Sequence, residues 1–311
     1  MVSICANIVR GFAALVVASA GGCGRLGFAT QTFCIDGPSG PVVDSAPFDG
    51  PPRCDRTAQF ATPVALDNLA TSQAVEATMR LLPDELTGYL WTTRSGNIDL
   101  AKVTRPGLDA PFTFQSFDEL NTINAEFEPT VASDDALLVF RSSRINDEGG
   151  GDLYVADKTP ASGTFVLRGP LTDLSTANTE VQPFLTDTEL LFVSDRSGAE
   201  RIYRSQRVGG NFATPTEIAE LAVAGASDTD PVMTADGKTI YFGSTRPGAI
   251  GIDIWTATRN DVMAPFTAAT LVANVNSSMT DAPSWISADQ CRLYLSSDRL
   301  GTPDVYVATR P

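Results

Sequence analysis

The chain has 311 residues, with 22 Lys and Arg against 37 Asp and Glu, and its formal net charge is −15. This length is sufficient for one large all-β domain with a sizeable core. The acidic balance, without any basic cluster, disfavours nucleic acid and anionic lipid surfaces as partners, because binding to phosphate requires clustered cations. The chain contains no His, which excludes Ser-His-Asp catalysis, Cys-His catalysis and His-ligated metal sites.

The first 22 residues have the pattern of an export signal. Arg10 precedes an apolar run at residues 11–20, which is too short for a permanent membrane span. The segment Ala20-Gly21-Gly22-Cys23 resembles the site at which bacterial lipoproteins are cut and lipidated on Cys, with Ala20 in place of the usual Leu. We therefore expect residues 1–22 to be a signal peptide and Cys23 to carry a lipid anchor. Ordinary signal cleavage, which gives a soluble periplasmic or secreted product, is the alternative.

Residues 23–56 are rich in Gly-Pro and Ala-Pro pairs and have hardly any periodic apolar pattern. This composition is typical of a semi-extended tether, here one that is anchored by lipid at Cys23. Beyond Cys23, the cysteines at Cys34, Cys54 and Cys291 enter an oxidising compartment. Because their number is odd, one thiol is left over or pairs with another chain.

Residues 57–311 contain five copies of one pattern, in which an acidic residue is followed about eight positions later by Asp and then by Arg. The Asp residues stand at 84, 134, 187, 236 and 289, so that successive copies are 50, 53, 49 and 53 residues apart. A repeat of this length with strand-like interiors indicates a β-propeller. The five sets are Glu76/Asp84/Arg94, Glu126/Asp134/Arg144, Glu180/Asp187/Arg196, Asp228/Asp236/Arg246 and Asp281/Asp289/Arg299.

Each repeat predicts three short strands and, in most repeats, a fourth. The second strand is the clearest, since aliphatic and aromatic residues run together there. Its five copies are residues 89–91, 137–140, 190–193, 240–242 and 293–295. The third strand begins at Asp99, Asp152, Asp253 and Asp304, with Arg201 at that place in the third repeat. The fourth strand begins near Phe112, Phe165, Phe212 and Phe266.

The fifth repeat reaches Pro311 directly after its third strand. Residues 60–69 have the same spacing of Phe, Pro and Leu as residues 212–221, which form the fourth strand of the third repeat. We therefore expect an N-terminal strand to complete the last blade, which closes a ring of five blades and leaves no exposed blade edge.

This closure gives two cysteines a geometric interpretation. Cys291 lies in the predicted turn between the first two strands of the fifth blade, and Cys54 lies just before that blade's fourth strand. Both points lie on the same face of an up-and-down blade, so a Cys54–Cys291 disulfide would pin the closing strand. A Cys34–Cys54 disulfide within the tether, or free thiols, are the alternatives.

Residues 234–259 and 287–310 resemble the WD-like β-propeller repeats of TolB-type periplasmic proteins and of many bacterial envelope lipoproteins. The resemblance covers roughly residues 58–311 and implies the fold. It implies no activity, because propellers host unrelated functions. TolB-type proteins also carry an N-terminal α/β domain that residues 24–56 do not supply, so a role in the Tol system is not transferred.

The repeated side chains have structural interpretations. We expect each repeated Asp to bond the backbone of its own turn, and each repeated Arg to pair with a neighbouring carboxylate and with strand ends. The leading acids precede the innermost strands and should approach one mouth of the central channel. Pairing with Arg is favoured for them, and a cation or ligand ring on the axis is the alternative. These leading acids are Glu76, Glu126, Glu180, Asp228 and Asp281.

Two further features have competing interpretations. The loop at residues 146–152 has oxygen ligands and glycines suited to Ca²⁺, but it lacks the spacing of a recognised calcium loop, and a solvated hairpin is favoured. The aromatic side chains of Trp91, Trp255 and Trp285 are expected to pack between blades, with sugar stacking as the alternative for Trp285.

These observations favour a non-enzymatic, monomeric binding or scaffolding protein of the cell envelope, which faces the periplasm or the cell surface. Its face loops would bind a protein or a glycan. The alternative is a glycoside hydrolase with two carboxylates in the axial funnel, and these acids would have to break the five-fold pattern. A surface protein without a discrete ligand is a third hypothesis.

Overall fold

The computed structural model describes residues 5–8, 31–34, 53–66, 68–71, 73–144 and 151–311, which fall into two units, 1–44 and 45–311. In the first unit, β1 (Cys5–Ile8) pairs antiparallel with β2 (Gln31–Cys34). The expected lipidation site Cys23, and most of the expected signal peptide and tether, lie outside the described residues. No helix among the described residues is long and apolar enough to cross a membrane.

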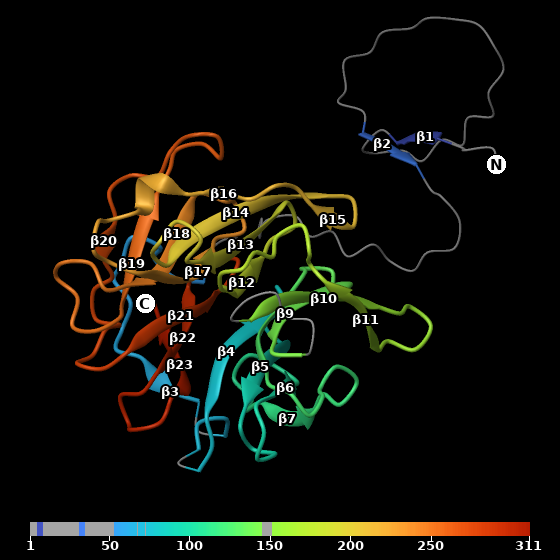
Figure 1. Ribbon diagram of the computed structural model, residues 1–311, viewed down its shortest axis with the longest axis horizontal. Coiled ribbons are helices and arrows are strands. Elements are labelled where there is room, and N and C mark those ends of the chain that lie inside the picture. The colour runs from blue at the N-terminus through green and yellow to red at the C-terminus, as the bar shows by residue number, and fades with distance from the viewer. Residues whose placement is uncertain (1–4, 9–30, 35–52, 67, 72, 145–150) are drawn as a thin grey trace, which may run out of the picture. The chain divides into compact units, whose positions relative to one another are not determined.

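The second unit confirms the predicted five-bladed β-propeller (Figure 1). Each blade is an antiparallel sheet whose strands follow one another outward from the centre of the ring. Blade 1 consists of β4 (Glu76–Leu81), β5 (Thr87–Thr92), β6 (Asp99–Thr104) and β7 (Thr113–Ser116). Blade 2 consists of β8 (Glu126–Val131), β9 (Leu137–Ser142), β10 (Asp152–Lys158) and β11 (Phe165–Pro170).

The other three blades have shorter outer strands. Blade 3 consists of β12 (Glu180–Leu185), β13 (Glu189–Ser194), β14 (Arg201–Val208), β15 (Asn211–Phe212) and β16 (Thr216–Glu217), and the 3₁₀ turn η1 (Ala219–Leu221) follows. Blade 4 consists of β17 (Asp228–Met233), β18 (Thr239–Ser244), β19 (Asp253–Thr258) and β20 (Thr270–Leu271). Blade 5 consists of β21 (Asp281–Ile286), β22 (Arg292–Ser297), β23 (Asp304–Thr309) and β3 (Val64–Ala65).

The innermost strands contact one another around the ring and hold it together. The N–H of each leading acid donates to a carbonyl that precedes the third strand of the blade before it, so neighbouring blades are joined by the backbone. These carbonyls belong to Pro303, Ile98, Gly151, Glu200 and Ile252. The innermost strands are largely buried.

The innermost strands of blades 1 to 4 bulge at their third residue, where the backbone has a positive φ. The residues with this conformation are Thr78, Glu128, Gln182 and Asp230. A bulge bends a strand and changes the direction of its side chains. The side chain at this position therefore points in a different direction from that of a residue in a regular strand. Blade 5 has Pro283 there, whose ring keeps φ negative, and its register shift falls between Pro283 and Trp285.

The N-terminal segment of the second unit completes blade 5, as the sequence predicts. Strand β3 pairs antiparallel with β23, with Ala65 opposite Tyr306 and Val64 opposite Val307. Further backbone bonds extend this contact, from Ala61 N to Thr309 O at 2.8 Å and from Leu66 N to Val305 O at 3.0 Å. The ring is therefore closed by two segments from opposite ends of the chain.

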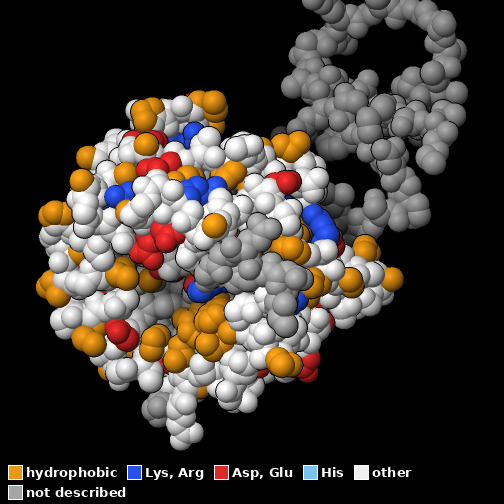
Figure 2. Space-filling view, in the orientation of Figure 1, with side chains coloured by type: hydrophobic (Ala, Val, Ile, Leu, Met, Phe, Trp, Pro, Cys, Tyr) orange, Lys and Arg blue, Asp and Glu red, His pale blue; other side chains and the backbone are white. Residues whose placement is uncertain are grey.

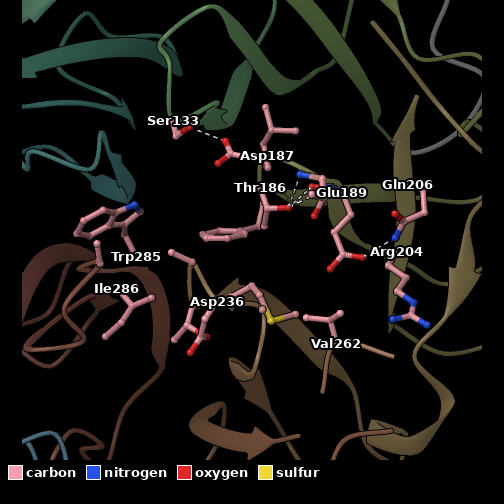
Figure 3. Close-up of a pocket in the computed structure, with 18 of the residues that line it drawn as sticks. Ser133, Thr186, Asp187, Glu189, Arg204, Gln206, Asp236, Val262, Trp285 and Ile286 are labelled. Carbon is pink, nitrogen blue, oxygen red and sulfur yellow. Dashed lines mark hydrogen bonds between the residues drawn. The ribbon is translucent and has the colours of Figure 1, made fainter. Parts of the chain in front are cut away.

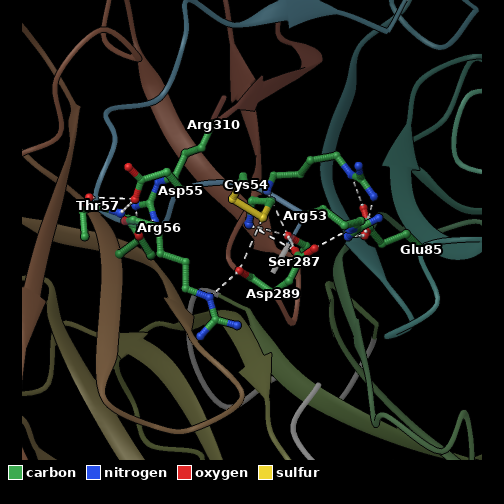
Figure 4. Close-up of a disulfide and its surroundings, with 12 residues drawn as sticks. Arg53, Cys54, Asp55, Arg56, Thr57, Glu85, Ser287, Asp289 and Arg310 are labelled. Carbon is green, nitrogen blue, oxygen red and sulfur yellow. Dashed lines mark hydrogen bonds and ion pairs between the residues drawn. A yellow bond between two sulfur atoms is a disulfide. The ribbon is translucent and has the colours of Figure 1, made fainter. Parts of the chain in front are cut away.

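A disulfide and an arginine cluster fasten the closing segment (Figure 4). Cys54 and Cys291 form a disulfide across a Cα–Cα distance of 5.7 Å. The neighbouring Arg53 pairs with Glu85 of blade 1 at 2.6 Å and also with Asp289 of blade 5. Burial would raise the pKa of Glu85, but hydrogen bonds from Arg292 and Arg53 hold it below its ordinary value. Arg53 therefore joins the first blade to the last.

We predict that the Cys54–Cys291 disulfide stabilises the closed ring by restricting the unfolded chain over 237 residues. Loop entropy gives a contribution of about 2–5 kcal/mol. Tryptic mapping without reductant should recover the linked peptides, and reductant should lower the Tm of the wild type. The variant Cys54→Ala/Cys291→Ala serves as the control, because its Tm should already be low and should not respond to reductant. A wild-type Tm that does not change when reductant is added would contradict the prediction.

Candidate functional site

A funnel of about 820 Å³ opens on the axis of the propeller, at the end of the ring where the innermost strands turn into the second strands (Figure 3). All five blades contribute to its lining. The last residue of each innermost strand is apolar, and together these side chains form an apolar ring in the funnel. The apolar ring consists of Leu81, Val131, Leu185, Met233 and Ile286.

The position before the apolar ring is aromatic in blades 3 and 5, and it is Thr130 in blade 2 and Val232 in blade 4. Phe184 and Trp285 line the funnel. In blade 1 the same position is Arg80, which is buried and lies with its guanidinium 4.7 Å from the centre of the Phe184 ring. Arg80 also donates to Ser284 O of blade 5 and, at 3.4 Å, to Pro183 O of blade 3. This arginine therefore ties three blades together across the centre of the ring.

The funnel extends into a recess between blades 3 and 4. Glu189, Arg204 and Gln206 come from β13 and β14 of blade 3, and Figure 3 shows Glu189 and Gln206 side by side. The Gln206 Nε2 donates to Glu189 Oε2 at 3.1 Å. From blade 4 the recess is lined by Arg259 and by Met263, which follow β19. Polar and charged groups are thus concentrated in this part of the funnel.

The leading acids begin the innermost strands, at the opposite end from the apolar ring, and are almost completely buried. Each one pairs with the repeated Arg of its own blade, as in Arg246 Nη2–Asp228 Oδ1 at 2.6 Å and Arg299 Nη2–Asp281 Oδ1 at 2.5 Å. The other pairs are Arg94–Glu76, Arg144–Glu126 and Arg196–Glu180. A hydroxyl at the end of the second strand also donates to each of four acids, from Thr92, Ser142, Ser194 and Ser244.

Each repeated Arg also donates to a carbonyl in the connection that leads into its blade, and most lie over aromatic rings, as Arg246 does over Phe242 at 4.6 Å. The accepting carbonyls belong to Leu69, Leu120, Leu174, Leu221 and Val275. Within the described part of the chain, no group of three or more acidic or cysteine side chains is arranged to hold a metal ion. The leading acids thus occupy separate ion pairs, which is the arrangement expected for structural residues.

Most repeated Asp residues bond the backbone of their own turn, as in Lys238 N to Asp236 Oδ1 at 3.0 Å. The same bond recurs at Asp84, Asp134 and Asp289. Blade 3 differs because three residues, instead of five, separate its first two strands. There Thr186 Oγ1 accepts from Glu189 N at 2.9 Å, and Asp187 accepts from Ser133 of blade 2. Asp187 and Asp236 both line the funnel.

Sequence reasoning missed a pair of carboxylates, the buried Asp230 and the largely buried Glu128, that break the five-fold pattern. Glu128 and Asp230 both occupy the bulge position and are linked through Gln182. Gln182 N donates to Glu128 Oε2 at 2.7 Å, and Gln182 Nε2 donates to Asp230 Oδ2 at 3.0 Å. Burial raises the pKa of Glu128, and burial together with the Glu128 charge raises the pKa of Asp230 to about 7. The only signal in the sequence is an acid-x-acid-Pro pattern in the second and fourth repeats.

The three tryptophans that are expected to pack between blades have different surroundings. Trp91 of blade 1 packs against Phe127 of blade 2 with ring centroids 5.6 Å apart, which is the expected contact between blades. Trp255 lies against the Arg246 guanidinium within blade 4. Trp285 lines the funnel and packs its ring edge-on against Tyr294. In the proposed calcium loop, residues 145–150 lie outside the described residues.

No protein-family model and no curated protein sequence match this chain. Among solved structures, it is similar to a GH62 hydrolase in complex with xylotriose, with a TM-score of 0.50 and 11% identity over 86% of this chain and 100% of that chain. It is also similar to a putative TolB from Agrobacterium tumefaciens (TM-score 0.46, 13% identity, 82% of this chain and 91% of that chain). A third similar structure is TolB from Acinetobacter baumannii (TM-score 0.45, 15% identity, 77% of this chain), of which the chain spans 56%. At these identities the likeness shows the propeller fold alone.

We predict that Arg299→Gln destabilises the fold strongly, because it leaves the buried Asp281 carboxylate without its cation. Removing one partner of a buried ion pair costs about 3–5 kcal/mol of unfolding free energy. The matched control is Arg168→Gln, whose ion pair with Asp157 is exposed and contributes less than about 1 kcal/mol. Urea unfolding followed by fluorescence measures both. Equal effects of the two substitutions would contradict the structural role of the repeated pair.

We predict that Asp230 makes the fold less stable as the pH rises. Its pKa is about 7 in the folded protein and 3.8 ordinarily, so between these values the folded state holds a proton that the unfolded state has lost. Stability therefore falls from pH 4 to above 7. Asp230→Asn removes this contribution and suits the positive φ.

The difference in Tm between Asp230→Asn and the wild type should therefore grow in favour of the variant from pH 5 to pH 8. Titrating groups that do not interact with Asp230 cancel in this difference, and what remains is the titration of Asp230 together with its interaction with Glu128. A difference that stays constant over this range would show that Asp230 has no raised pKa.

Proposed function

We propose that this propeller is a non-enzymatic binding protein of the cell envelope, which takes a protein or glycan partner at the axial funnel and the turns around its mouth. The observation that supports this proposal is the funnel itself. Its volume of about 820 Å³ lies within the range of ligand sites in proteins. Its apolar ring and aromatic walls, with a few polar groups in one recess, have the composition that such sites share.

The mouth of the funnel also carries exposed apolar side chains that suit a partner. Met263 is 87% exposed and Val262 is 46% exposed, and both line the funnel from the segment after β19. Exposed apolar groups at the rim of a concave site are typical of an interaction surface. Lys and Arg lie scattered over the face viewed in Figure 2, without a basic patch that would suit nucleic acid.

The commitment of the carboxylates supports binding without turnover. The leading acids are held in ion pairs with the repeated arginines, and four of the five repeated Asp residues bond their own turns. Glu128 and Asp230 are bonded to Gln182 and do not line the funnel. Three acids do line it, and each accepts a hydrogen bond: Asp187 from Ser133, Glu189 from Gln206 and Asp236 from Lys238 N. A glycosidase requires two carboxylates that face one sugar site. The location in the envelope rests on the pattern of residues 1–23, with lipid at Cys23.

A glycoside hydrolase is the second candidate, because Glu128 and Asp230 are two neighbouring acids that break the repeat. Its test is an assay of the full chain against a panel of p-nitrophenyl glycosides, beside the variant Glu128→Gln. Our proposal expects no release of nitrophenol above the background rate. Turnover by the wild type that Glu128→Gln abolishes would overturn the binding proposal and favour the hydrolase.

We predict that Met263→Asp abolishes capture of the partner from an envelope extract. The substitution places a charge on the apolar rim without disturbing the core, since Met263 is 87% exposed. Bound proteins are identified by mass spectrometry, and glycans by an array probed with the same preparation. The Tm should stay within about 1 °C of the wild type, because surface changes have small effects on stability.

The matched control is Leu300→Asp. Leu300 is 75% exposed in the connection between β22 and β23, which the antiparallel topology places at the opposite end of the ring from the funnel. This variant should capture the partner as the wild type does. Loss of capture by Leu300→Asp, with capture retained by Met263→Asp, would place the partner on the other face and overturn the proposal.

A further inference from the structure

The recess between blades 3 and 4 contains two guanidinium groups that lack a carboxylate partner within the described part of the chain. Arg204 lies on β14, and Arg259 follows β19. Both line the funnel, and neither forms an ion pair within the described residues. The repeated arginines, by contrast, all pair with carboxylates. The recess therefore differs from the sites of the repeated arginines, where each cation has a carboxylate partner.

Arg259 is the more informative of the two residues, because it is 6% exposed. Its Nε donates to Gly237 O at 2.7 Å and its guanidinium lies 4.5 Å from the centre of the Phe266 ring, but its buried Nη1 has no acceptor. A buried charged donor without a partner is costly unless something else supplies the acceptor. This group therefore points to an acceptor that is not part of the described chain.

The charges around Arg259 do not compensate it. Burial lowers the pKa of Arg259 and the Arg204 charge lowers it further, while Glu189, Glu220 and nearby Asp261 oppose the shift without cancelling it. Glu189, the acid that lines the recess, already accepts a hydrogen bond from Gln206. Glu220 and Asp261 likewise accept hydrogen bonds, from Phe266 N at 3.2 Å and from Met263 N at 2.9 Å. None of these acids forms an ion pair with Arg204 or Arg259 within the described residues, so both guanidinium groups can still donate to an added carboxylate.

Strand β14 places the Arg204 side chain at the funnel. Arg204 and Gln206 are two residues apart on one strand and therefore project from the same face. Thr216, which lies opposite Arg204 in the register, also lines the funnel. An anion held by Arg204 and Arg259 would therefore lie beside amide and hydroxyl groups, in a cavity that also contains the apolar ring.

We propose that this recess is a carboxylate-binding subsite, and that it holds the free C-terminal carboxylate of a partner peptide whose last side chains lie on the apolar ring. The inference rests on the proposed function and names the ligand class of its funnel. Arginine is suited to carboxylate through paired, charge-assisted hydrogen bonds. A peptide end is favoured over an acidic sugar because the apolar ring accommodates aliphatic or aromatic side chains, whereas a sugar would place hydroxyl groups against it.

The test uses the full chain and a panel of N-acetylated tripeptides that end in Val, Leu or Phe, each with a free carboxylate or with a C-terminal amide. Isothermal titration should show one acid bound per chain, and the matching amide should bind about 10- to 100-fold more weakly, as expected for loss of a charged hydrogen bond. Arg259→Gln should remove the preference for acid over amide. Arg204→Gln should weaken binding of the acid without affecting binding of the amide.

The matched control is Arg207→Gln, on the same strand but outside the funnel, which should bind the acid as the wild type does. Circular dichroism establishes that each variant is folded, and Arg204→Gln keeps the test decisive if Arg259→Gln does not fold. Equal binding of acid and amide, absence of binding by every acid at millimolar concentration, or a preference that survives both arginine substitutions would each overturn the proposal.

Two further outcomes separate the inference from its alternatives. Binding of glucuronate oligosaccharides, weakened by Arg259→Gln and accompanied by no peptide binding, would overturn the peptide assignment in favour of an acidic glycan. Capture of the envelope partner that Met263→Asp abolishes but Arg204→Gln and Arg259→Gln leave intact would overturn the carboxylate subsite alone. In that case the proposed function of the funnel would stand.

Discussion

The propeller depends on one repeated joint, in which an arginine neutralises the buried acid at the start of the innermost strand. The same arginine donates to a carbonyl in the incoming connection, so one side chain fixes two segments of each blade. In blade 1 this carbonyl belongs to Leu69, which follows the closing strand β3. The N-terminal segment therefore supplies the same part that the connections between blades supply elsewhere, and ring closure uses the ordinary chemistry of the repeat.

Because the repeated arginines and leading acids neutralise one another in ion pairs, a ligand site is expected where the blades differ in sequence. Blade 1 has Arg80 at a position where blades 3 and 5 have aromatic side chains, and it crosses the centre of the ring. Blade 3 has a shorter turn, in which Asp187 lacks the usual backbone bond and accepts instead from Ser133 of blade 2 at the funnel. Blades 3 and 4 together form a recess with two arginines. All these differences lie at or beneath the same mouth, which is why the binding proposal is placed there.

The spacing of acids, turns and strands was sufficient to predict five blades, and the match between residues 60–69 and 212–221 was sufficient to predict how they close. The pairing of the leading acids also followed from their recurrence with Arg. The funnel was not predictable, since its lining combines ordinary strand residues such as Leu81 and Met233 with departures that no repeat marks. Glu128 and Asp230 were missed because a bulge with positive φ re-aims them, and periodicity alone does not reveal such a bend.

Hydrogen exchange of the full chain, with and without the captured envelope partner, is the measurement that tests the central claim most directly. If the partner binds at the funnel, three segments of the propeller should become protected from exchange at their backbone amides. These segments are the turn at residues 186–188, the turn at 234–238 and the segment 260–264. The connections at residues 245–252 and 298–303, at the opposite end of the ring, should exchange as before. Protection confined to those opposite connections would contradict a function at the axial funnel.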